Sequence, residues 1–499
     1  MKRYLLSIDE GTTSERVILY DCSKRKIVDT HHLPISTSYP HSGWVEQGAE
    51  QIWESVRTSL LYLVKKHKLS AQNTHGICIT NQREAVCSWD NLGNSIAPVI
   101  SWQCKRTSDL CEKMSADKKH FLKQKTGLIL DSYFSASKIK WLLENDSNIA
   151  SANQLKQLHF GTIDSFLIYK LSGGKVYATD STNASRTMLV NLENPFEYDP
   201  ELLSFWKLNN TYLPKILNSI DNFGVEVETG ENLPIIAVIG DQQSSLVGQG
   251  CTTKNLAKMT FGTGGFLLVN TGKTIVLEND DLLNTVAYSI NGKTTYAVEG
   301  SIFNCGSAVN YIKNVLNLFE DYAKLDKICN KSKTNGLVMI PTFTGIGAPF
   351  WNGDLRASII NLNFDSSRSD ITKATIESFA FMLEEILSNL RAKGIKIKEL
   401  HVDGGVSKTD YLLKLIASTS NLTVLRTKES ESTAIGAINL GLLASGVVDS
   451  LDTLSENTQI SKVFTPEKEL AVYAKQSYEK WHNEFLIQLN KVNSVKNNR

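Results

Sequence analysis

The sequence predicts an α/β protein built from two duplicated halves, and three observations support this prediction. The chain has 499 residues, more than one core usually holds, because single hydrophobic cores rarely grow beyond about 250–300 residues. Short β-branched runs alternate with longer amphipathic stretches. An apolar run, a turn rich in Gly and Thr, and a second apolar run occur at 5–21 and again at 256–270. We therefore expect two domains, 1–249 and 250–499.

Three short runs have the length and composition of buried strands. They are HGICITN at 75–81, PIIAVIGD at 234–241 and ELHVDGG at 399–405. Asp241 ends the second run, and in doubly wound sheets ligands gather beyond the carboxyl ends of the strands. The sequence alone equally allows Asp241 to be a helix N-cap.

Three longer stretches show the periodicity of amphipathic helices. They cover residues 49–67, 137–145 and 369–394, and the last ends on Gly394, which suits a left-handed helix cap. The expected pattern is therefore one of helices packed on sheets.

The composition favours a small-molecule partner. Lys and Arg number 53 against 52 Asp and Glu, a net charge of +1, so no global field attracts nucleic acid or an anionic membrane. The 8 cysteines form no Cys-x-x-Cys pair and are expected to be reduced core thiols. Because no stretch approaches the ~18–20 apolar residues of a membrane span, we expect no membrane insertion and a cytoplasmic location.

The first Gly- and Thr-rich turn has the composition of a phosphate site. A tight hairpin carrying Thr12, Thr13 and Ser14 exposes backbone N–H groups and hydroxyls, which suit phosphate oxygens. Asp9 precedes the turn and is placed to hold Mg²⁺, while Arg16 follows it and is able to reach back to the phosphates. An isolated hairpin of this kind more often needs glycine only for its own geometry.

Two further turns favour the nucleotide interpretation. The second hairpin carries FGTGGF at 261–266, and a third turn, VDGGVSKTD at 402–410, follows a strand and opens a helical stretch. Glycines at such a place allow the backbone to approach a nucleotide closely. No GxxxxGK[ST] motif is present, so this is not a Walker loop.

Together with these three turns, further blocks of the sequence resemble the FGGY carbohydrate kinases, within the sugar-kinase, actin and Hsp70 ATPase superfamily. The blocks are GWVEQ (43–47), ITNQRE (79–84), SWQCKRT (101–107), TGLILDSYFSASKIKW (126–141), FGTIDSFLIYKL (160–171), TDSTNASRTML (179–189), GDQQSSLVGQ (240–249) and FTGIGAPFW (343–351). The resemblance runs from about residue 3 to about residue 480.

The resemblance implies two RNase H-like, actin-like ATPase domains around a central catalytic cleft. It implies ATP-dependent phosphorylation of a small polyol, glycerol, with Mg²⁺ and with release of ADP. It also implies a homo-oligomer, a dimer or a tetramer.

The family pattern assigns the acceptor side and the reaction to a first set of residues. By resemblance Asp241 is the general base that takes the proton from the attacking hydroxyl. The implied acceptor-binding residues are Arg83, Glu84, Trp102, Tyr133, Asp241, Gln242 and Phe266. Without the resemblance, the Arg83–Glu84 pair more often lies in solvent and the aromatic residues more often pack in a core.

The same pattern assigns the donor side to a second set. Asp9 is implied as the Mg²⁺ ligand. The implied ATP-binding residues are Thr12, Thr13, Ser14, Arg16, Thr263, Gly306, Asn310, Gly405 and Thr409. Four positions depart from the family: Glu10 replaces Gln, Glu15 replaces Ser, Asn310 replaces Gln and Thr409 replaces Asn. The two glutamates are expected to add negative charge beside the phosphates.

Three other functions compete with this interpretation. A kinase for another polyol or a ketose needs a larger pocket, which Trp102 is expected to close. An ATP-driven clamp like actin or Hsp70 needs neither an Arg-Glu pair nor a carboxylate at Asp241. A catalytically silent relative is disfavoured because every catalytic position of the family pattern is filled.

Overall fold

The computed structural model describes residues 2–277, 281–334, 336–428 and 431–497, which group into two compact units. The first unit contains Met1–Thr252, Gly272–Ala297 and Glu431–Asn457, and the second contains Thr253–Thr271, Val298–Ser430 and Thr458–Arg499. Each unit is formed by three separate segments of the chain, so no single position in the sequence divides one unit from the other. A boundary between the duplicated halves near residue 249 stays a prediction.

The first unit is a mixed α/β unit. Its strands are β1 (Tyr4–Glu10), β2 (Ser14–Asp21), β3 (Lys26–Pro34), β4 (Thr37–Ser38), β5 (Glu46–Gln47), β6 (Thr74–Asn81), β7 (Cys87–Asp90), β8 (Val99–Ile100), β9 (Leu158–Gly161), β10 (Ala178–Asp180), β11 (Lys215–Leu217), β12 (Ile235–Gly240) and β15 (Leu283–Ile290). Its helices are α1 (Ala49–His67), α2 (Ser108–Glu112), α3 (Ala116–Thr126), α4 (Ser135–Asn145), α5 (Ser147–Gln154), α6 (Ile163–Leu171), α7 (Ser181–Ala184), α8 (Pro200–Trp206), α9 (Asp241–Gly248), α14 (Ser432–Ala444) and α15 (Leu451–Glu456).

The second unit is also α/β. Its strands are β13 (Leu256–Phe261), β14 (Gly265–Gly272), β17 (Val338–Ile340), β18 (Ser358–Ile360), β19 (Glu399–Asp403), β20 (Thr423–Thr427) and β21 (Ile460–Phe464), and β16 (Lys293–Ile302) enters it from the first unit. Its helices are α10 (Gly306–Asn314), α11 (Leu325–Lys331), α12 (Arg368–Ala392), α13 (Asp410–Ser420) and α16 (Lys468–Asn497), with short 3₁₀ turns at Tyr322–Lys324 and Val406–Lys408.

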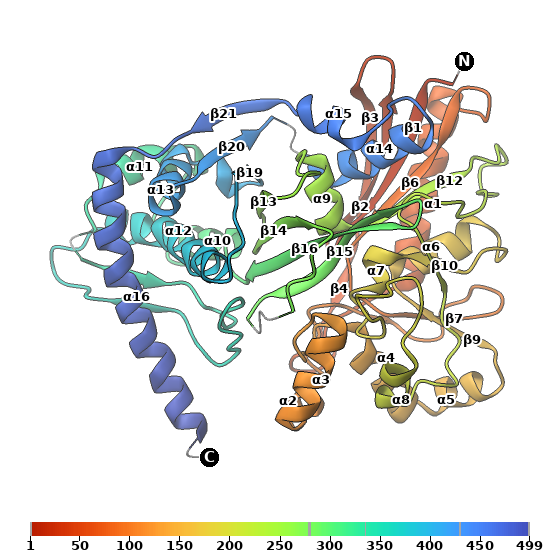
Figure 1. Cartoon of the computed structure of the whole chain (residues 1–499), viewed down its shortest axis with the longest axis horizontal. Helices are drawn as coiled ribbons and strands as arrows, with labels where there is room; N and C mark the ends of the chain where they lie inside the picture. Colours follow the sequence, from red (N-terminus) through yellow and green to blue (C-terminus); the bar gives the residue numbers. More distant parts are fainter. Residues whose placement is uncertain (1, 278–280, 335, 429–430, 498–499) are drawn as a thin grey trace. The chain divides into compact units, whose positions relative to one another are not determined.

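The two units repeat one strand arrangement, which confirms the predicted duplication. In the first unit β1 and β2 form an antiparallel hairpin, β6 lies parallel to β1, and β12 lies parallel to β6. In the second, β13 and β14 form the hairpin, β19 lies parallel to β13, and β20 lies parallel to β19. Each unit thus carries the same hairpin followed by two parallel strands (Figure 1).

Hydrophobic cores on both faces of β1 explain why Leu5, Leu6 and Ile8 are all apolar. Leu6 and Ile8 belong to a core that includes residues of α1, whereas Leu5 belongs to a second core that includes Ala434 and Ile438 of α14. Successive strand residues point to opposite faces, so a sheet covered on both sides favours apolar residues at successive positions.

Close packing of two helices fixes the position of α9, whose first residue is Asp241. A Cβ atom on Gly436 of α14 would lie 1.8 Å from the backbone oxygen of Ser244 of α9. A Cβ on Gly248 would lie 1.9 Å from the backbone oxygen of Ser432. Both contacts exclude any side chain, so the glycines let the two helix backbones touch.

The predicted elements agree with the structure. The stretch predicted at 49–67 is α1, the stretch at 137–145 lies inside α4, and the stretch at 369–394 corresponds to α12. Ser367 and Asp370 form a capping box at the start of α12, and Gly394 beyond its end has a φ of +74°. All eight cysteines are unbonded and buried, as expected.

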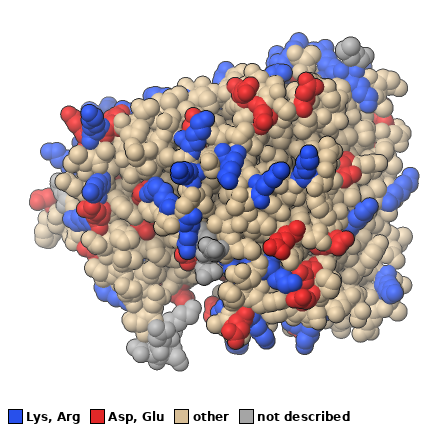
Figure 2. Space-filling view, in the orientation of Figure 1, with Lys and Arg blue, Asp and Glu red and all other residues tan. Residues whose placement is uncertain are grey.

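The surface is consistent with the balanced composition. Figure 2 shows Lys and Arg side chains occurring together with Asp and Glu side chains across the visible face. Within the described ranges, none of the helices combines the length and the apolar character that a membrane crossing requires.

Candidate active site

Two neighbouring parallel strands bring the predicted acceptor residues together. Arg83 and Glu84 follow the carboxyl end of β6, and Asp241 follows the carboxyl end of β12. These strands are paired so that Gly240 lies opposite Asn81. The sheet edge beyond the strands therefore places Asp241 next to Arg83, although 158 residues separate them in sequence.

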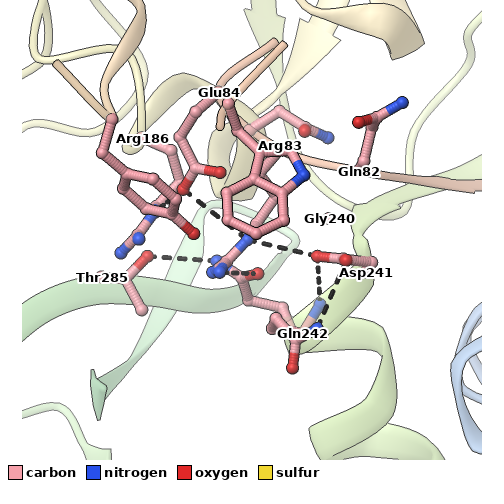
Figure 3. Close-up of polar contacts among 12 residues, drawn as sticks. Gln82, Arg83, Glu84, Arg186, Gly240, Asp241, Gln242 and Thr285 are labelled. Atoms are coloured by element: carbon pink, nitrogen blue, oxygen red, sulfur yellow. Dashed lines mark hydrogen bonds and ion pairs between the residues drawn. The ribbon is translucent and has the colours of Figure 1, made fainter. Parts of the chain in front are cut away.

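Arg83 lies between two carboxylates. Its Nε atom is 3.2 Å from Asp241 Oδ1 and 3.7 Å from Glu84 Oε1. Arg186 approaches Glu84 as well, and its Nε donates a hydrogen bond of 2.5 Å to Glu84 Oε1 (Figure 3). The side chains of Arg83, Glu84 and Arg186 are at most 2% exposed, whereas that of Asp241 is 27% exposed. The Arg83–Glu84 pair is thus not a solvated surface pair.

A glutamine fixes the guanidinium of Arg83. Arg83 Nη1 donates to Gln243 Oε1 at 3.1 Å, and Gln243 Nε2 donates to Thr285 Oγ1 at 3.1 Å. Asp241 Oδ1 accepts from the backbone N–H of Gln242 at 2.7 Å, and Gln242 Nε2 donates to Asp241 Oδ2 at 3.3 Å. These hydrogen bonds orient the Arg83 and Asp241 side chains.

Two aromatic side chains lie beside this charge network. The rings of Trp102 and Tyr133 meet edge to face with centroids 5.5 Å apart. The guanidinium of Arg186 lies over the Tyr133 ring, 5.8 Å from its centroid. Trp102 Nε1 donates a 3.0 Å hydrogen bond to Thr12 Oγ1, which ties this aromatic wall to the first Gly- and Thr-rich turn.

That turn has the predicted hairpin geometry. The N–H of Gly11 donates to the Ser14 carbonyl at 3.0 Å, while Gln47 Nε2 donates to the Thr12 carbonyl at 2.7 Å. Within the parts of the chain that the structure describes, no residue accepts a hydrogen bond from the backbone N–H groups of Thr12 and Thr13. Such paired N–H groups are donors of the kind that hold phosphate oxygens.

Asp9 lies at the base of the turn in a site suited to a cation. The pKa of Asp9 is raised to about 7, mainly by burial and in part by the nearby Asp241, against the opposing effect of Arg16. Arg16 Nε lies 3.6 Å from Asp9 Oδ2. Its Nη1 donates a hydrogen bond to Glu431 at the start of α14. A bound cation would favour the charged form of Asp9.

The carboxylates of Asp9 and Asp241 are of the kind that binds Mg²⁺ together with water and substrate oxygens. The described ranges contain no cluster of three or more His, Cys, Asp or Glu side chains able to hold a metal ion. Mg²⁺ in phosphate-transfer sites is commonly bound by one or two carboxylates together with water and substrate oxygens. Asp9, with Asp241 close to it, meets this requirement.

Glu10 and Glu15, the two glutamates that depart from the family pattern, are buried in the first unit. Burial disfavours the negative charge of both side chains. Burial raises the pKa of Glu10 well above its usual value, against a hydrogen bond that Gln82 Nε2 donates to it at 2.9 Å. Burial likewise raises the pKa of Glu15 to about 8, against a 2.5 Å hydrogen bond from Ser59 Oγ. Burial therefore favours the protonated form of both carboxyl groups. The sequence does not show that these side chains are desolvated, and the effect of their charge on the phosphates stays a prediction.

We expect Glu15→Gln to stabilise the protein at alkaline pH. Between pH 4.5 and about 8 the folded state keeps a proton that the unfolded state has lost, so the free energy of unfolding falls as pH rises across this window. Glutamine keeps the acceptor for Ser59 and carries no charge. The variant should exceed the wild type by more than about 1 kcal/mol at pH 8 and match it near pH 4.5.

Thermal or urea unfolding at several pH values measures this difference. Glu54→Gln serves as a matched control because the Glu54 side chain is 60% exposed. Parallel stability curves for Glu15→Gln and the wild type from pH 5 to pH 8 would contradict the assignment of a raised pKa to Glu15.

The remaining predicted residues lie in the second unit. Thr263 is in the β13–β14 turn, where its carbonyl accepts from the N–H of Cys305 at 3.0 Å, and Gly306 N–H donates to the Gly262 carbonyl at 2.9 Å. Asn310 lies one turn beyond Gly306 on α10 and accepts a 2.5 Å hydrogen bond from Tyr322. The structure thus places the first residues of α10 against this turn.

The third turn and the last aromatic residue lie in the same unit. Gly404 has a φ of +91°, and a Cβ atom there would lie 2.4 Å from the Phe261 carbonyl oxygen at the end of β13. Gly405 and Thr409 follow it, and Thr409 immediately precedes α13. Phe266 is a partly buried residue of β14 that pairs with Thr260.

The sequence alone did not identify several residues of the hydrogen-bond network around Arg83, Glu84 and the first turn. Arg186, Gln82 and Gln243 lie inside blocks that carry the family resemblance, so a signal for them existed. Glu431 has no local signal, because its contact with Arg16 joins positions 415 residues apart.

Comparisons with known proteins find relatives that match almost the whole chain. Residues 4–248 match the model of the FGGY family of carbohydrate kinases, N-terminal domain, and residues 257–445 match the C-terminal domain of that family. A glycerol kinase of Alteromonas mediterranea is 39% identical over 472 residues, covering 93% of this chain and 95% of that protein. A glycerol kinase of Bacillus anthracis is 36% identical over 488 residues, covering 96% and 98%.

A solved structure is similar over the whole chain. The glycerol kinase of Plasmodium falciparum, crystallised with ADP, superposes with a TM-score of 0.90 at 32% sequence identity. The superposition covers 97% of this chain and 98% of that one. Similarity in sequence and in fold therefore extends over both units.

Proposed function

Because the chain belongs to the FGGY family of carbohydrate kinases, we propose that it transfers the γ-phosphoryl group of ATP to a terminal hydroxyl of glycerol. The products are sn-glycerol 3-phosphate and ADP. The observation that carries this proposal is the position of Arg83 between the carboxylates of Glu84 and Asp241. A guanidinium and two carboxylates supply the paired donors and acceptors that a small uncharged triol requires.

Asp241 is the proposed general base. It lies at the start of α9, is partly exposed, and is oriented by Arg83 and by the backbone of Gln242. Its carboxylate takes the proton of the attacking hydroxyl as the new oxygen–phosphorus bond forms and the bond between the γ-phosphorus and the departing ADP oxygen breaks. A strong base is not needed, because phosphoryl transfer proceeds through a loose transition state that depends mainly on positioning and charge neutralisation.

The other acceptor residues hold and orient glycerol in this proposal. Arg83 donates to glycerol oxygens, and Glu84 accepts from glycerol hydroxyls. Trp102 belongs to the aromatic wall that limits the length of the polyol, and Tyr133, which meets it edge to face, is the proposed hydroxyl donor. We also assign acceptor contacts to Gln242 and Phe266.

The first turn holds the donor phosphates. Thr12, Thr13 and Ser14 supply backbone N–H groups and hydroxyls, and Arg16 supplies a cation. When bound, Mg²⁺ neutralises the charge that develops on the phosphate oxygens, and Asp9 is the residue that would hold it. On the nucleotide side we propose contacts from Thr263, Gly306, Asn310, Gly405 and Thr409.

Product analysis tests this proposal. Incubation with ATP, Mg²⁺ and glycerol should give one new phosphomonoester, identified by ³¹P NMR as glycerol 3-phosphate, in an amount equal to the ADP formed. Formation of inorganic phosphate with no phosphorylated glycerol would instead indicate an ATP-driven clamp. A cytoplasmic location and assembly into a homo-oligomer stay predictions.

We expect Trp102→Ala to lower the selectivity of the enzyme for glycerol over longer polyols. Loss of the indole removes one wall of the acceptor site and the hydrogen bond to Thr12. The KM for glycerol should rise about tenfold, and the ratio of kcat/KM for glycerol to that for xylitol should fall at least as much. Steady-state assays with both polyols measure the ratio.

The matched control is Trp206→Phe, a change at a fully buried tryptophan of α8 that is not part of the acceptor wall. This control should leave the selectivity ratio unchanged. Equal ratios in Trp102→Ala and the wild type would show that Trp102 does not limit the acceptor.

A further inference from the structure

A buried carboxylate that no step of the proposed reaction uses lies in the first unit. Asp180 is the last residue of β10 and directly precedes α7, and its side chain is 0% exposed. Aspartate is rarely buried this completely unless other groups satisfy its oxygens. The hydrogen bonds of Asp180 therefore show which parts of the fold this carboxylate holds.

Uncharged hydroxyl and amide groups donate to both oxygens of Asp180. Its Oδ1 accepts from Thr182 Oγ1 at 2.8 Å, and from the backbone N–H and the side-chain amide of Asn183, both at 3.0 Å. Its Oδ2 accepts from Ser219 Oγ at 2.8 Å and from the Thr182 N–H at 3.0 Å. Burial raises the pKa of Asp180, against the opposing effect of these hydrogen bonds. The carboxylate thus fixes three residues at once.

Two of these residues, Thr182 and Ser219, hold the outer edge of β12. The Gly240 N–H donates to Thr182 Oγ1 at 2.8 Å, and the Val238 N–H donates to the Ser219 carbonyl at 2.9 Å. Since β12 is an edge strand of the five-stranded sheet, these bonds satisfy N–H groups outside the sheet. Gly240 is the last residue of β12 and directly precedes Asp241 (Figure 3).

The third residue, Asn183, ties the neighbouring strand to the same carboxylate. Asn81 is the last residue of β6, and its side-chain amide exchanges two hydrogen bonds with that of Asn183, at 3.0 and 3.2 Å. Arg83 lies two residues beyond Asn81. Asp180 is therefore connected, through one side chain in each case, to the ends of both strands that carry the acceptor residues.

We propose that Asp180 and Thr182 are positioning residues for the phosphoryl transfer. Asp180 orients the Thr182 hydroxyl, and that hydroxyl holds the Gly240 N–H. The position of Gly240 in turn sets where the Asp241 carboxylate lies. This inference rests on the proposed role of Asp241 as the general base. A displacement of about 1 Å in a reacting group is enough to cost about 10²-fold in rate.

Steady-state kinetics of Thr182→Val and Thr182→Ser in the full chain test the inference. Valine keeps the shape of threonine but removes the hydroxyl, so Gly240 and Asp180 each lose a hydrogen-bond partner. We expect the turnover number of Thr182→Val to fall at least about tenfold, while the KM values for glycerol and ATP stay within about threefold of the wild type. Thr182→Ser restores the hydroxyl and should return turnover to within about threefold.

Thr126→Val is the matched control for the loss of a buried hydroxyl. Thr126 ends α3, is 0% exposed like Thr182, and also both donates and accepts. Its Oγ1 donates to the Leu122 carbonyl at 2.7 Å and accepts from the Leu128 N–H at 3.1 Å. Thr126→Val should therefore lose as much stability as Thr182→Val in urea unfolding, yet keep turnover within about twofold of the wild type.

Equal losses of turnover in Thr126→Val and Thr182→Val would overturn the inference, because they would reflect general destabilisation. Wild-type turnover in Thr182→Val would also overturn it, as would a loss that Thr182→Ser does not recover. If Thr182→Val fails to fold, Ser219→Ala decides the matter. It removes a single hydrogen bond to Asp180 and leaves the Gly240 bond in place, so turnover should fall at least about threefold with KM unchanged, and wild-type turnover would overturn the inference.

The same assay separates this inference from the proposed function. A wild-type protein that forms no glycerol 3-phosphate would contradict the proposed kinase reaction and this inference together. An active wild type with any of the contradicting results for the variants would overturn only the positioning role.

Discussion

Asp241→Asn is expected to lower the turnover number by about 10²–10⁴-fold, the usual contribution of a general base. Asparagine keeps the size of the side chain and an oxygen that accepts from the Gln242 N–H, but it does not take up the proton of the attacking hydroxyl. Glycerol affinity should change much less than turnover, because Arg83 and Glu84 remain. Steady-state kinetics and glycerol binding by calorimetry separate the two effects.

A helix cap offers the matched control for this change. Asp146 caps α5 by accepting from the N–H groups of Asn148 and Ile149. Asparagine is as good an N-cap as aspartate, so Asp146→Asn should leave turnover and stability almost unchanged. If Asp241→Asn also kept near-normal turnover, the role of Asp241 would be limited to the start of α9, and its assignment as the general base would be wrong.

Glu84→Gln is expected to lower both stability and glycerol affinity. The change removes the charge that lies beside two buried guanidinium groups, those of Arg83 and Arg186. Breaking a buried ion pair from one side typically costs about 3–5 kcal/mol. We expect a loss of about 3 kcal/mol in the free energy of unfolding and a rise in the KM for glycerol of more than about tenfold.

An exposed ion pair provides the comparison. Glu144 pairs with Lys140 on α4, and its side chain is 51% exposed. Glu144→Gln should change the free energy of unfolding by less than about 1 kcal/mol. Denaturant unfolding of both variants measures the contrast. A loss below about 1 kcal/mol for Glu84→Gln would mean that Glu84 does not hold the two arginines.

Local patterns were sufficient to predict most elements of the fold. The stretch 49–67 reproduces α1, and the predicted strand at 75–81 differs from β6 by one residue at its start. These elements are long or strongly patterned, so their own residues determine them. The repeated hairpin also predicted the duplication, because each copy begins one of two similar strand arrangements.

Contacts between distant residues could not be predicted in this way. Arg186 meets Glu84 across 102 positions, and Glu431 meets Arg16 across 415. The raised pKa values of Glu10 and Glu15 follow from burial, which depends on how the rest of the fold surrounds these side chains. The family resemblance supplied the roles of single residues, and the structure supplied their distances.

The measurement that tests the central claim most directly is the rate of ADP release with Mg-ATP and a panel of acceptors: glycerol, dihydroxyacetone, erythritol, xylulose and water alone. We predict rapid ADP release with glycerol, much slower release with erythritol and xylulose, and almost none in water. A rate in water equal to that with glycerol would contradict the proposed kinase reaction, and faster release with xylulose than with glycerol would contradict the proposed acceptor.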